Sequence, residues 1–279
     1  MKFTKMHGAG NDYIYFNCLE KNIENPEELS IRLSDRHFSV GGDGIVLICP
    51  SQVADVKMRM FNADGSEGKM CGNAIRCVAK YIYDRGISSK ELIKVETLSG
   101  TKQILVSVED GKVKRAKVDM GKAAGLFHDE ITIPEGQGSF LTNFPLLMGD
   151  TTWEITTVSM GNPHCVVFLP EVAGLDLPKI GPGFERHPFF PQQINTEFVR
   201  VISPDVLEMR VWERGSGETL ACGTGACAAV VAAILNGYCK ENNDVTVRLL
   251  GGELTIRVTD ETVYMTGNAV EVFTGEVEA

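Results

Sequence analysis

The chain of 279 residues contains an internal repeat with one constant offset. Asn11 within Gly10-Asn11 recurs as Asn162 within Gly161-Asn162, 151 positions later. The same offset, without a gap, relates Met58-Arg59 to Met209-Arg210, Phe61 to Trp212, Glu67 to Glu218, Cys71-Gly72 to Cys222-Gly223, Gly86 to Gly237 and Gly100 to Gly251. Two copies of so long a period are not a solenoid, which stacks many short repeats. The sequence therefore predicts two similar halves, 1–122 and 123–279, with a linker and extra loops in 121–149.

Each half shows the same order of secondary-structure signals. Short runs rich in β-branched and aromatic residues precede a Cys-Gly pair and a helix, and two more runs follow the helix. The helices are predicted at Asn73–Tyr83 and Thr224–Leu235, and a glycine, Gly86 or Gly237, ends each of them. The predicted strands are Tyr13–Phe16, Ile45–Cys49, Val56–Phe61, Ile93–Thr97, Ile104–Val108, Cys165–Phe168, Thr196–Val201, Val206–Trp212, Val245–Leu250 and Leu254–Val258.

The second of these helices contains ten consecutive apolar residues, Ala226–Leu235, and has no polar face there. Such a helix should be buried on every side, and strands of its own half are its natural cover. We therefore predict an α+β fold of two sheet-wrapped helices, with the active site in the cleft between the halves and the last strand crossing back to the first half. Another helix, Pro26–Asp35, has proline in its first turn and is predicted at the periphery.

Composition narrows the classes of function. The net charge of −10 argues against a nucleic-acid partner, which requires a concentrated positive surface. The longest apolar run is too short to span a bilayer and the N-terminal segment has no signal-peptide core, so we expect a cytoplasmic protein without a membrane partner. Disulfides are uncommon there, so the eight cysteines should be thiols. Their spacing, and that of the five histidines, predicts no metal site.

Two of the eight cysteines, Cys71 and Cys222, precede the two helices at equivalent positions of the repeat. The N–H groups and the dipole at a helix N-terminus stabilise an anion, so a thiol there ionises more easily. The following glycines, Gly72 and Gly223, allow a small carboxylate to approach the backbone donors. Two such thiols can remove a proton from one face of a carbon and deliver one to the other face, while the donors stabilise the carbanion. A matched pair favours this chemistry over two small residues at tight turns.

The motifs around these positions resemble those of the diaminopimelate epimerase family over essentially the whole chain. They are His7-Gly8-Ala9-Gly10-Asn11-Asp12, Gly41-Gly42-Asp43-Gly44, Phe61-Asn62-Ala63-Asp64-Gly65-Ser66-Glu67, Met70-Cys71-Gly72-Asn73-Ala74, Gly161-Asn162-Pro163-His164, Trp212-Glu213-Arg214-Gly215 and Ala221-Cys222-Gly223-Thr224-Gly225. The resemblance implies two pseudosymmetric halves, each a β-barrel-like sheet wrapped around a central helix. It also implies a cofactor-independent epimerase, usually a homodimer, that interconverts LL- and meso-2,6-diaminopimelate in lysine and peptidoglycan precursor biosynthesis.

The resemblance also implies roles for single residues. Cys71 and Cys222 would be the acid–base pair, and Arg214 would pair with the distal carboxylate of the substrate. The reacting carboxylate would be bound by backbone donors at Gly72-Asn73 and Gly223-Thr224. His164 and Glu213 resemble the residues that tune the two thiols. The other implied substrate-binding residues are Asn11, Asn62, Asn162, Asn195 and again Glu213.

The chain departs from the family at Gly44, where members often have glutamine, so any contact there must come from backbone or water. Asn11 and Asn162 could instead be turn residues that tolerate left-handed backbone. The repeat offset, which also relates Gly44 to Asn195, favours positions around one cleft. Arg214 could instead be a surface ion-pair partner, and His7 and His164 could be loop histidines with satisfied hydrogen bonds.

Other functions stay open on the sequence. Racemases of the proline racemase kind have Met-Cys-Gly-His, whereas Asn73 follows Gly72 here, and a small cyclic substrate would leave Arg214 without a role. Related isomerases that use a carboxylate base do not need two cysteines. A redox or structural thiol protein could close a Cys71–Cys222 disulfide. A nucleotide-binding enzyme is disfavoured because neither G-x-G-x-x-G nor a P-loop is complete. The sequence does not exclude a pyridoxal enzyme.

Overall fold

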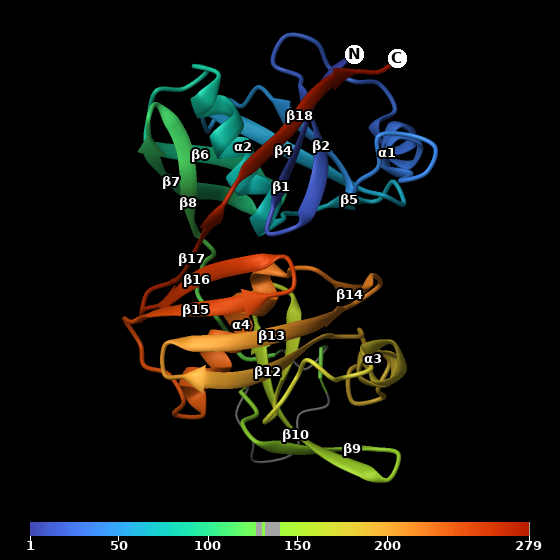
Figure 1. The fold of residues 1–279 in the computed structure, drawn as a ribbon, viewed down its shortest axis with the longest axis vertical. Helices are drawn as coiled ribbons and strands as arrows, with labels where there is room; N and C mark the ends of the chain where they lie inside the picture. The colour runs from blue at the N-terminus through green and yellow to red at the C-terminus, as the bar shows by residue number, and fades with distance from the viewer. Residues whose placement is uncertain (127–129, 132–139, 279) are drawn as a thin grey trace. The chain divides into compact units, whose positions relative to one another are not determined.

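The computed structural model describes residues 1–126, 130–131 and 140–278, which form two compact units (Figure 1). Unit 1 comprises Met1–Asp119 and the segment from Thr266 onward, and unit 2 comprises Met120–Met265. The chain thus returns to unit 1 after completing unit 2. Part of the expected linker, at 127–129 and 132–139, lies outside the described residues. The stretch 121–149 also contains a strand that the sequence did not predict, β9 (Phe144–Met148).

Unit 1 contains a curved mixed sheet in which two of the strand pairs are parallel and the others are antiparallel. Its strands are paired in the order β18–β1–β2–β3–β4–β6–β7–β8, with β2–β3 and β4–β6 parallel and the other pairs antiparallel. The elements are β1 (Lys2–Gly8), β2 (Asn11–Asn17), α1 (Pro26–Ser34), β3 (Gly44–Cys49), β4 (Val56–Asn62), β5 (Glu67–Gly68), α2 (Gly72–Asp84), β6 (Leu92–Thr97), β7 (Gly100–Glu109), β8 (Lys112–Asp119) and β18 (Val270–Glu276).

Unit 2 repeats this pairing pattern. The order is β9–β10–β11–β12–β13–β15–β16–β17, with β11–β12 and β13–β15 parallel. The elements after β9 are β10 (Thr151–Ser159), β11 (Pro163–Phe168), α3 (Leu177–Glu185), β12 (Asn195–Ser203), β13 (Val206–Glu213), β14 (Gly217–Thr219), α4 (Gly223–Leu235), β15 (Asp244–Leu249), β16 (Gly252–Val258) and β17 (Val263–Asn268), whose last residues belong to unit 1.

The 151-residue offset holds in three dimensions. It relates α2 to α4 residue for residue, and it also relates α1 to α3. Each unit carries the same ion pair across its short hairpin: Arg59 Nε lies 2.7 Å from Glu67 Oε1, and Arg210 Nε lies 2.8 Å from Glu218 Oε1. Helix α3 was not expected from the sequence. The signal that was available for α3 is the repeat offset, because it carries the helix predicted at 26–35 onto the residues of α3.

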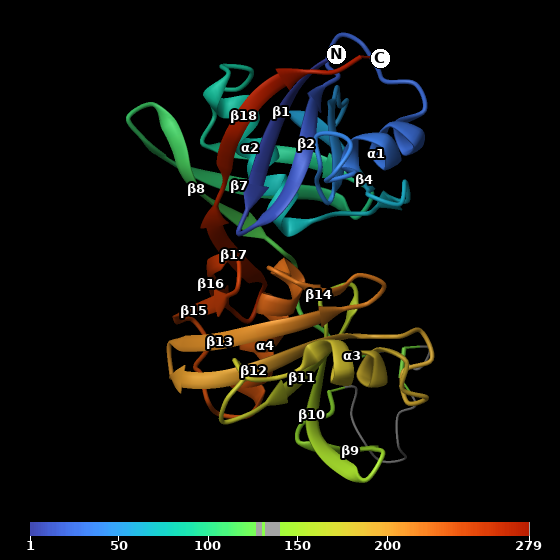
Figure 2. The same cartoon turned by 45° about the vertical axis from the view of Figure 1, so that its right-hand side comes forward.

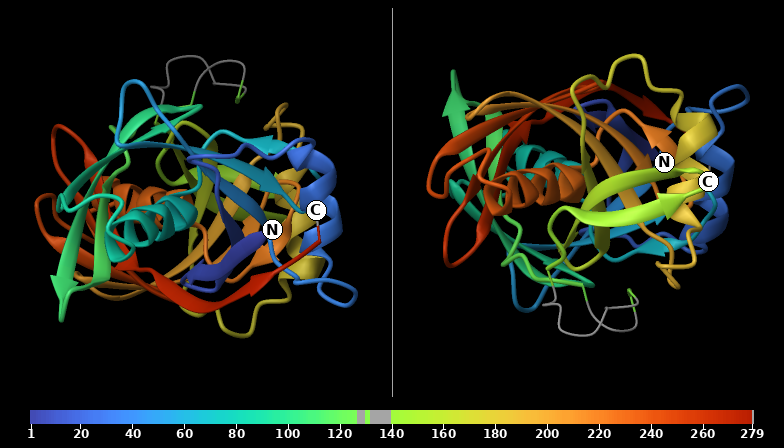
Figure 3. Two further views of the ribbon diagram at one scale, coloured as in Figure 1. Left: turned by 90° about the horizontal axis from the view of Figure 1, so that it is seen from above. Right: turned by 90° about the horizontal axis from the view of Figure 1, so that it is seen from below.

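The central helices are enclosed by strands of their own units, as the fold prediction expected. Helix α4 is buried over Gly225–Ala233 and packs against β10, β11, β12, β13, β15 and β16 (Figure 2). Helix α2 packs against β1, β2, β6, β7 and β8 (Figure 3). Helix α1 covers β3 and β4 from outside the sheet. None of the described helices is long and apolar enough to cross a membrane.

The contact between α3 and β13 leaves no room for a side chain at Gly181. A Cβ atom there would lie 2.2 Å from Cδ2 of Trp212, whose indole Nε1 donates to Glu185 Oε2 at 2.7 Å. At Gly183, on the same helix, an added Cβ atom would lie 3.3 Å from the flexible Met148 side chain, which can move aside.

We therefore expect Gly181→Ala to lower the free energy of unfolding by about 1–3 kcal/mol, the usual effect of overpacking. Gly183→Ala should be neutral or stabilising by up to about 1 kcal/mol, because alanine favours the helix. Urea unfolding followed by tryptophan fluorescence compares the two variants. Equal midpoints would contradict the proposed clash.

Candidate active site

Both matched cysteines occupy the N-cap position of a central helix. Cys71 (φ −132°, ψ 122°) and Cys222 (φ −114°, ψ 113°) are extended, and a glycine begins each helix. Their carbonyl groups accept the first intrahelical bonds, from Ile75 N–H at 3.0 Å and from Ala226 N–H at 2.9 Å. The N–H groups of the first turn therefore precede the helical hydrogen-bond ladder and are available for capping or for an anion.

In unit 1, the Cys71 thiol is connected to a carboxylate through one asparagine. Cys71 Sγ, which is half-buried, donates to Asn11 Oδ1 at 3.3 Å, and Asn11 Nδ2 donates to Asp43 Oδ2 at 2.7 Å. On the helix that follows this thiol, the fully buried Arg76 donates to Gly72 O and to Asn73 Oδ1, both at 3.0 Å. The first turn of α2 is thus fixed by a buried guanidinium.

Asp43 belongs to a cluster of four charged side chains. Arg36 Nη2 bridges the two carboxylates, at 2.7 Å from Asp12 Oδ1 and 2.8 Å from Asp43 Oδ1, and Lys5 Nζ lies 2.6 Å from Asp12 Oδ2. Burial, together with the charge of Asp12, raises the pKa of Asp43. Burial also acts to raise the pKa of Asp12, but the hydrogen bonds from Arg36 and Lys5 outweigh it and lower that pKa. Sequence analysis missed this cluster.

The structure gives the reason for glycine at position 44. Gly44 has φ +152°, and a Cβ atom there would lie 1.9 Å from the carbonyl oxygen of Phe61 on β4. A glutamine side chain therefore has no place on this backbone. Opposite Gly44 in the ladder lies Asn62, whose Nδ2 donates to Ser66 Oγ at 3.0 Å within the β4–β5 hairpin.

In unit 2, the Cys222 thiol is buried and faces carboxylates. Its Sγ accepts from Gly225 N–H at 3.3 Å and lies 3.5 Å from Thr224 Oγ1. Burial, followed by the charges of Glu213 and Glu197, raises the pKa of Cys222 well above its usual range. Burial also raises the pKa of Glu213, although Thr219 Oγ1 donates to its carboxylate. The surroundings of Cys222 therefore favour the protonated thiol.

A second hydrogen-bonded chain reaches the start of α4. His164 and Glu197 are fully buried, with Nδ1 and Oε1 2.7 Å apart. His164 Nε2 lies 3.1 Å from Asn162 Oδ1, and Asn162 Nδ2 donates to Thr224 Oγ1 at 3.3 Å. The sequence motifs do not single out Glu197, although a carboxylate within the predicted strand Thr196–Val201 was the signal for it.

Asn195 and Arg214 shape one loop of unit 2. Asn195 is buried, donates from Nδ2 to Pro163 O at 2.9 Å and accepts from Arg214 N–H at 3.0 Å. The exposed Arg214 side chain donates to Gln192 O at 3.0 Å. Both polar ends of Asn195 are thus engaged in fixing the backbone that carries Arg214.

The sequence-predicted residues fall into two sets, one in each unit. Unit 1 holds Asn11, Gly44, Asn62, Cys71, Gly72 and Asn73, and unit 2 holds Asn162, His164, Asn195, Glu213, Arg214, Cys222, Gly223 and Thr224. The hydrogen bonds above join Asn11 to Cys71, and join His164 and Asn162 to Thr224 beside Cys222. These hydrogen bonds do not connect Asn62 to Cys71 or Asn11, since the Asn62 side chain donates to Ser66.

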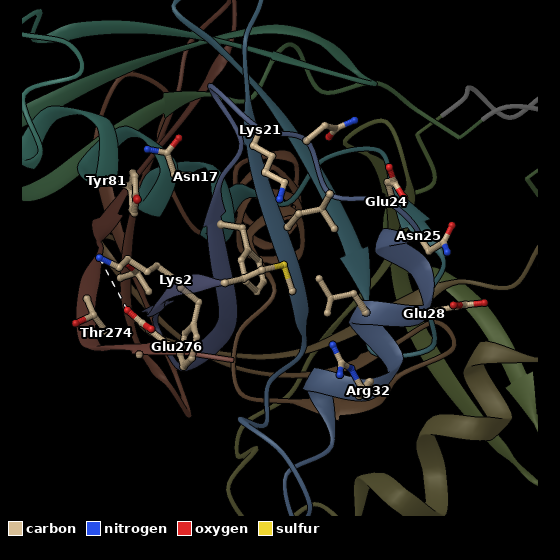
Figure 4. Close-up of a pocket in the computed structure, with 18 of the residues that line it drawn as sticks. Lys2, Asn17, Lys21, Glu24, Asn25, Glu28, Arg32, Tyr81, Thr274 and Glu276 are labelled. Carbon is tan, nitrogen blue, oxygen red and sulfur yellow. Dashed lines mark ion pairs between the residues drawn. The ribbon is translucent and has the colours of Figure 1, made fainter. Parts of the chain in front are cut away.

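A pocket of about 1190 Å³ in unit 1 is lined by other residues (Figure 4). Its lining carries both signs of charge, including Lys2 and Glu276, which form an ion pair, and Arg32 and Glu28 on α1. None of the predicted site residues lines it. Within the described part of the chain, no group of three or more His, Cys, Asp or Glu side chains is arranged to hold a metal ion.

Comparison by sequence relates this chain to the diaminopimelate epimerase family. The family model for diaminopimelate epimerase matches residues 3–126 and 156–272. Relatives named diaminopimelate epimerase include one from Acetivibrio thermocellus, 55% identical over 280 residues with 100% of this chain and 99% of the relative covered. Another, from Methanococcus maripaludis, is 51% identical over 280 residues with both chains covered completely.

Solved structures share the fold at low sequence identity. A probable proline racemase from Agrobacterium radiobacter K84 has a TM-score of 0.74 at 14% identity, covering 99% of this chain and 92% of the other. A phenazine biosynthesis protein of the PhzF family from Bacillus anthracis has a TM-score of 0.70 at 16% identity, covering 100% and 99%. These likenesses concern the fold alone. The family match and the relatives at 51–55% identity over the full chain show that this chain belongs to the diaminopimelate epimerase family.

Proposed function

We propose that this protein interconverts LL- and meso-2,6-diaminopimelate without a cofactor, in lysine and peptidoglycan precursor biosynthesis. The observation that carries the proposal is the pair of thiols, Cys71 and Cys222, at repeat-equivalent N-caps of two enclosed helices. In this mechanism the thiolate of one cysteine takes the α-proton, and the thiol of the other donates a proton to the opposite face. The two cysteines thereby exchange protonation states. The reacting carboxylate and the carbanion are stabilised by first-turn N–H groups at Gly72-Asn73 and Gly223-Thr224.

The proposal gives the remaining site residues distinct roles. Glu213 and His164 tune the two thiols, and Arg214 binds the distal carboxylate. The four asparagines Asn11, Asn62, Asn162 and Asn195 bind or orient polar groups of the substrate. Gly44 contributes backbone only. The raised pKa of Cys222 supports its thiol form in the free protein, and this form can donate a proton.

We also propose that the protein is a cytoplasmic homodimer. All eight cysteines are free thiols, which suits a reducing compartment. The strand β18 exposes two large apolar side chains, Val272 and Phe273, which a second copy of the chain could cover. The sedimentation coefficient of the purified protein decides the oligomeric state.

Turnover of LL-diaminopimelate in deuterated buffer tests the proposed function. Two separate bases predict deuterium at the inverted carbon of new meso product, while unreacted substrate stays unlabelled at early times. Mass spectrometry of the separated isomers measures both pools. Early label in both pools would indicate one shared base, and turnover of proline instead of diaminopimelate would assign the proline racemase activity.

Alanine variants test the two thiols. We expect Cys71→Ala and Cys222→Ala each to lower kcat by at least about 10²-fold, because each variant lacks one acid–base group. Cys77→Ala and Cys227→Ala are matched controls on the same two helices, since both side chains are buried in the core. Near-normal activity of either N-cap variant would remove that thiol from the mechanism.

The pH dependence of Cys222 alkylation tests the influence of Glu213. The thiolate is the reactive form, and the Glu213 charge opposes its formation. Glu213→Gln should therefore lower the pKa of Cys222 and move iodoacetamide alkylation to lower pH, although burial still acts to raise that pKa. Glu218→Gln, a carboxylate of the same hairpin paired with Arg210, is the control. Identical pH profiles for the two variants would show that the charge of Glu213 does not raise the pKa of Cys222.

A further inference from the structure

Two asparagines related by the repeat offset, Asn11 and Asn162, have opposite amide orientations. Asn11 turns its amide nitrogen to Asp43 and its oxygen to the Cys71 thiol. Asn162 turns its oxygen to His164 Nε2 and its nitrogen to Thr224 Oγ1. The first amide therefore offers an acceptor to the N-cap residue Cys71, and the second offers a donor to Thr224, the second residue of α4.

The orientation of Asn11 follows from the chemistry of Asp43. An ionised carboxylate only accepts hydrogen bonds, so the atom of Asn11 that faces it must be the nitrogen. The same carboxylate accepts from Asp12 N–H at 3.0 Å and from Arg36 Nη2 at 2.8 Å, and these donors stabilise its ionised form. With Nδ2 held in this way, Asn11 Oδ1 can only point toward the sulfur of Cys71.

The repeat shows that this arrangement exists in one unit only. The offset places Ile194 of unit 2 at the position of Asp43, so unit 2 has no carboxylate there. Conversely, Glu197, which holds His164 in unit 2, corresponds to Val46 in unit 1. Both units thus have the asparagine at this position, but the side chains that hold it differ: Asp43 contacts Asn11, and His164 contacts Asn162.

We propose that Asp43 is a positioning residue whose carboxylate holds the Asn11 amide with its oxygen on Cys71 and thereby stabilises the thiol form of Cys71. The hydrogen bond from S–H to Oδ1 exists only while the sulfur is protonated. A freed amide can rotate and offer its N–H groups, which stabilise a thiolate instead. The proposal deepens the proposed function, because it concerns the protonation of one of the two acid–base thiols.

Two titratable groups that interact with Cys71 do not supply this effect. Tyr15 on β2 and Cys77 on α2 are fully buried, and burial raises the pKa of Tyr15 well above its usual range and that of Cys77 to about 11. Both are therefore neutral near pH 7. Arg76 on α2 stays charged in every variant used below. Through Asn11 and Asp43, Cys71 is connected to the cluster around Arg36, to which Lys5 and Asp12 also belong.

The test is the rate at which iodoacetamide alkylates Cys71 across pH, followed by mass spectrometry of the peptide that contains it. We expect Asp43→Ala to make alkylation at pH 7 about fivefold faster, the effect of losing one hydrogen bond to the thiol, because alanine leaves Asn11 Nδ2 without its acceptor. Asp12→Asn is the matched control, because it removes a carboxylate from the same cluster but keeps the bond between Asn11 and Asp43. Equal rates for the two variants would overturn the proposal.

A second pair of variants separates positioning from the charge of Asp43 acting through space. In an Asn11→Ala background, Asp43→Ala should not accelerate alkylation further, since the side chain that Asp43 positions is gone. Acceleration that persists in this background would show a direct charge effect and overturn the proposal. If Asp43→Ala does not fold by circular dichroism, Asp43→Ser removes the same carboxylate in its place.

The alkylation experiment is independent of turnover. A protein that shows the Asp43 effect but does not epimerise diaminopimelate keeps this inference and loses the proposed function. An active epimerase in which Asp43→Ala leaves Cys71 alkylation unchanged keeps the function and loses the inference.

Discussion

Enclosure of each central helix by strands of its own unit is the constraint on which the rest of the structure depends. Helix α4 has no exposed face over Gly225–Ala233, so its sides cannot carry chemistry in water. Its N-terminus, where backbone N–H groups lack helical partners, is the part that can bind a polar ligand. The repeat places an extended cysteine followed by glycine at this position in both units. The enclosed fold and the placement of the thiols are thus two consequences of one arrangement.

The sequence predicts the enclosed parts of the fold well, because burial leaves a strong pattern. The apolar run Ala226–Leu235 and the alternating strands around it depend mainly on neighbours along the chain. Helix α3 was missed because Gly181, Pro182 and Gly183 lower its local helix propensity. Its formation depends on packing against Trp212, a contact that is distant in the sequence.

The candidate site likewise contains residues that the sequence predicts and residues that only the structure reveals. Motifs and the repeat offset locate the thiols and the asparagines, since these depend on residue type and spacing. They do not locate Glu197 or the cluster of Lys5, Asp12, Arg36 and Asp43, whose members come from β1, β2 and the loop between α1 and β3 and meet only in the folded unit. The steric reason for Gly44 likewise depends on the carbonyl group of an adjacent strand. Side-chain contacts between elements are therefore the part that sequence reasoning lacks.

The two units keep one backbone and differ in their buried charges. Burying a charged group is costly unless it is paired, and Glu197 is paired with His164 through one oxygen, while its Oε2 has no hydrogen-bond partner among the described residues. At the equivalent position of unit 1, Val46 packs in the core without such a cost. Since the shared fold does not need this carboxylate, its presence in unit 2 is explained better by its effect on the helix terminus. There it opposes ionisation of Cys222 and holds the imidazole that orients Asn162. The two units thus act on equivalent N-cap cysteines through different side chains, Glu213 and Glu197 beside Cys222 and Asn11 with Asp43 beside Cys71, so the protonation of each thiol depends on a different set of groups although the backbones are alike.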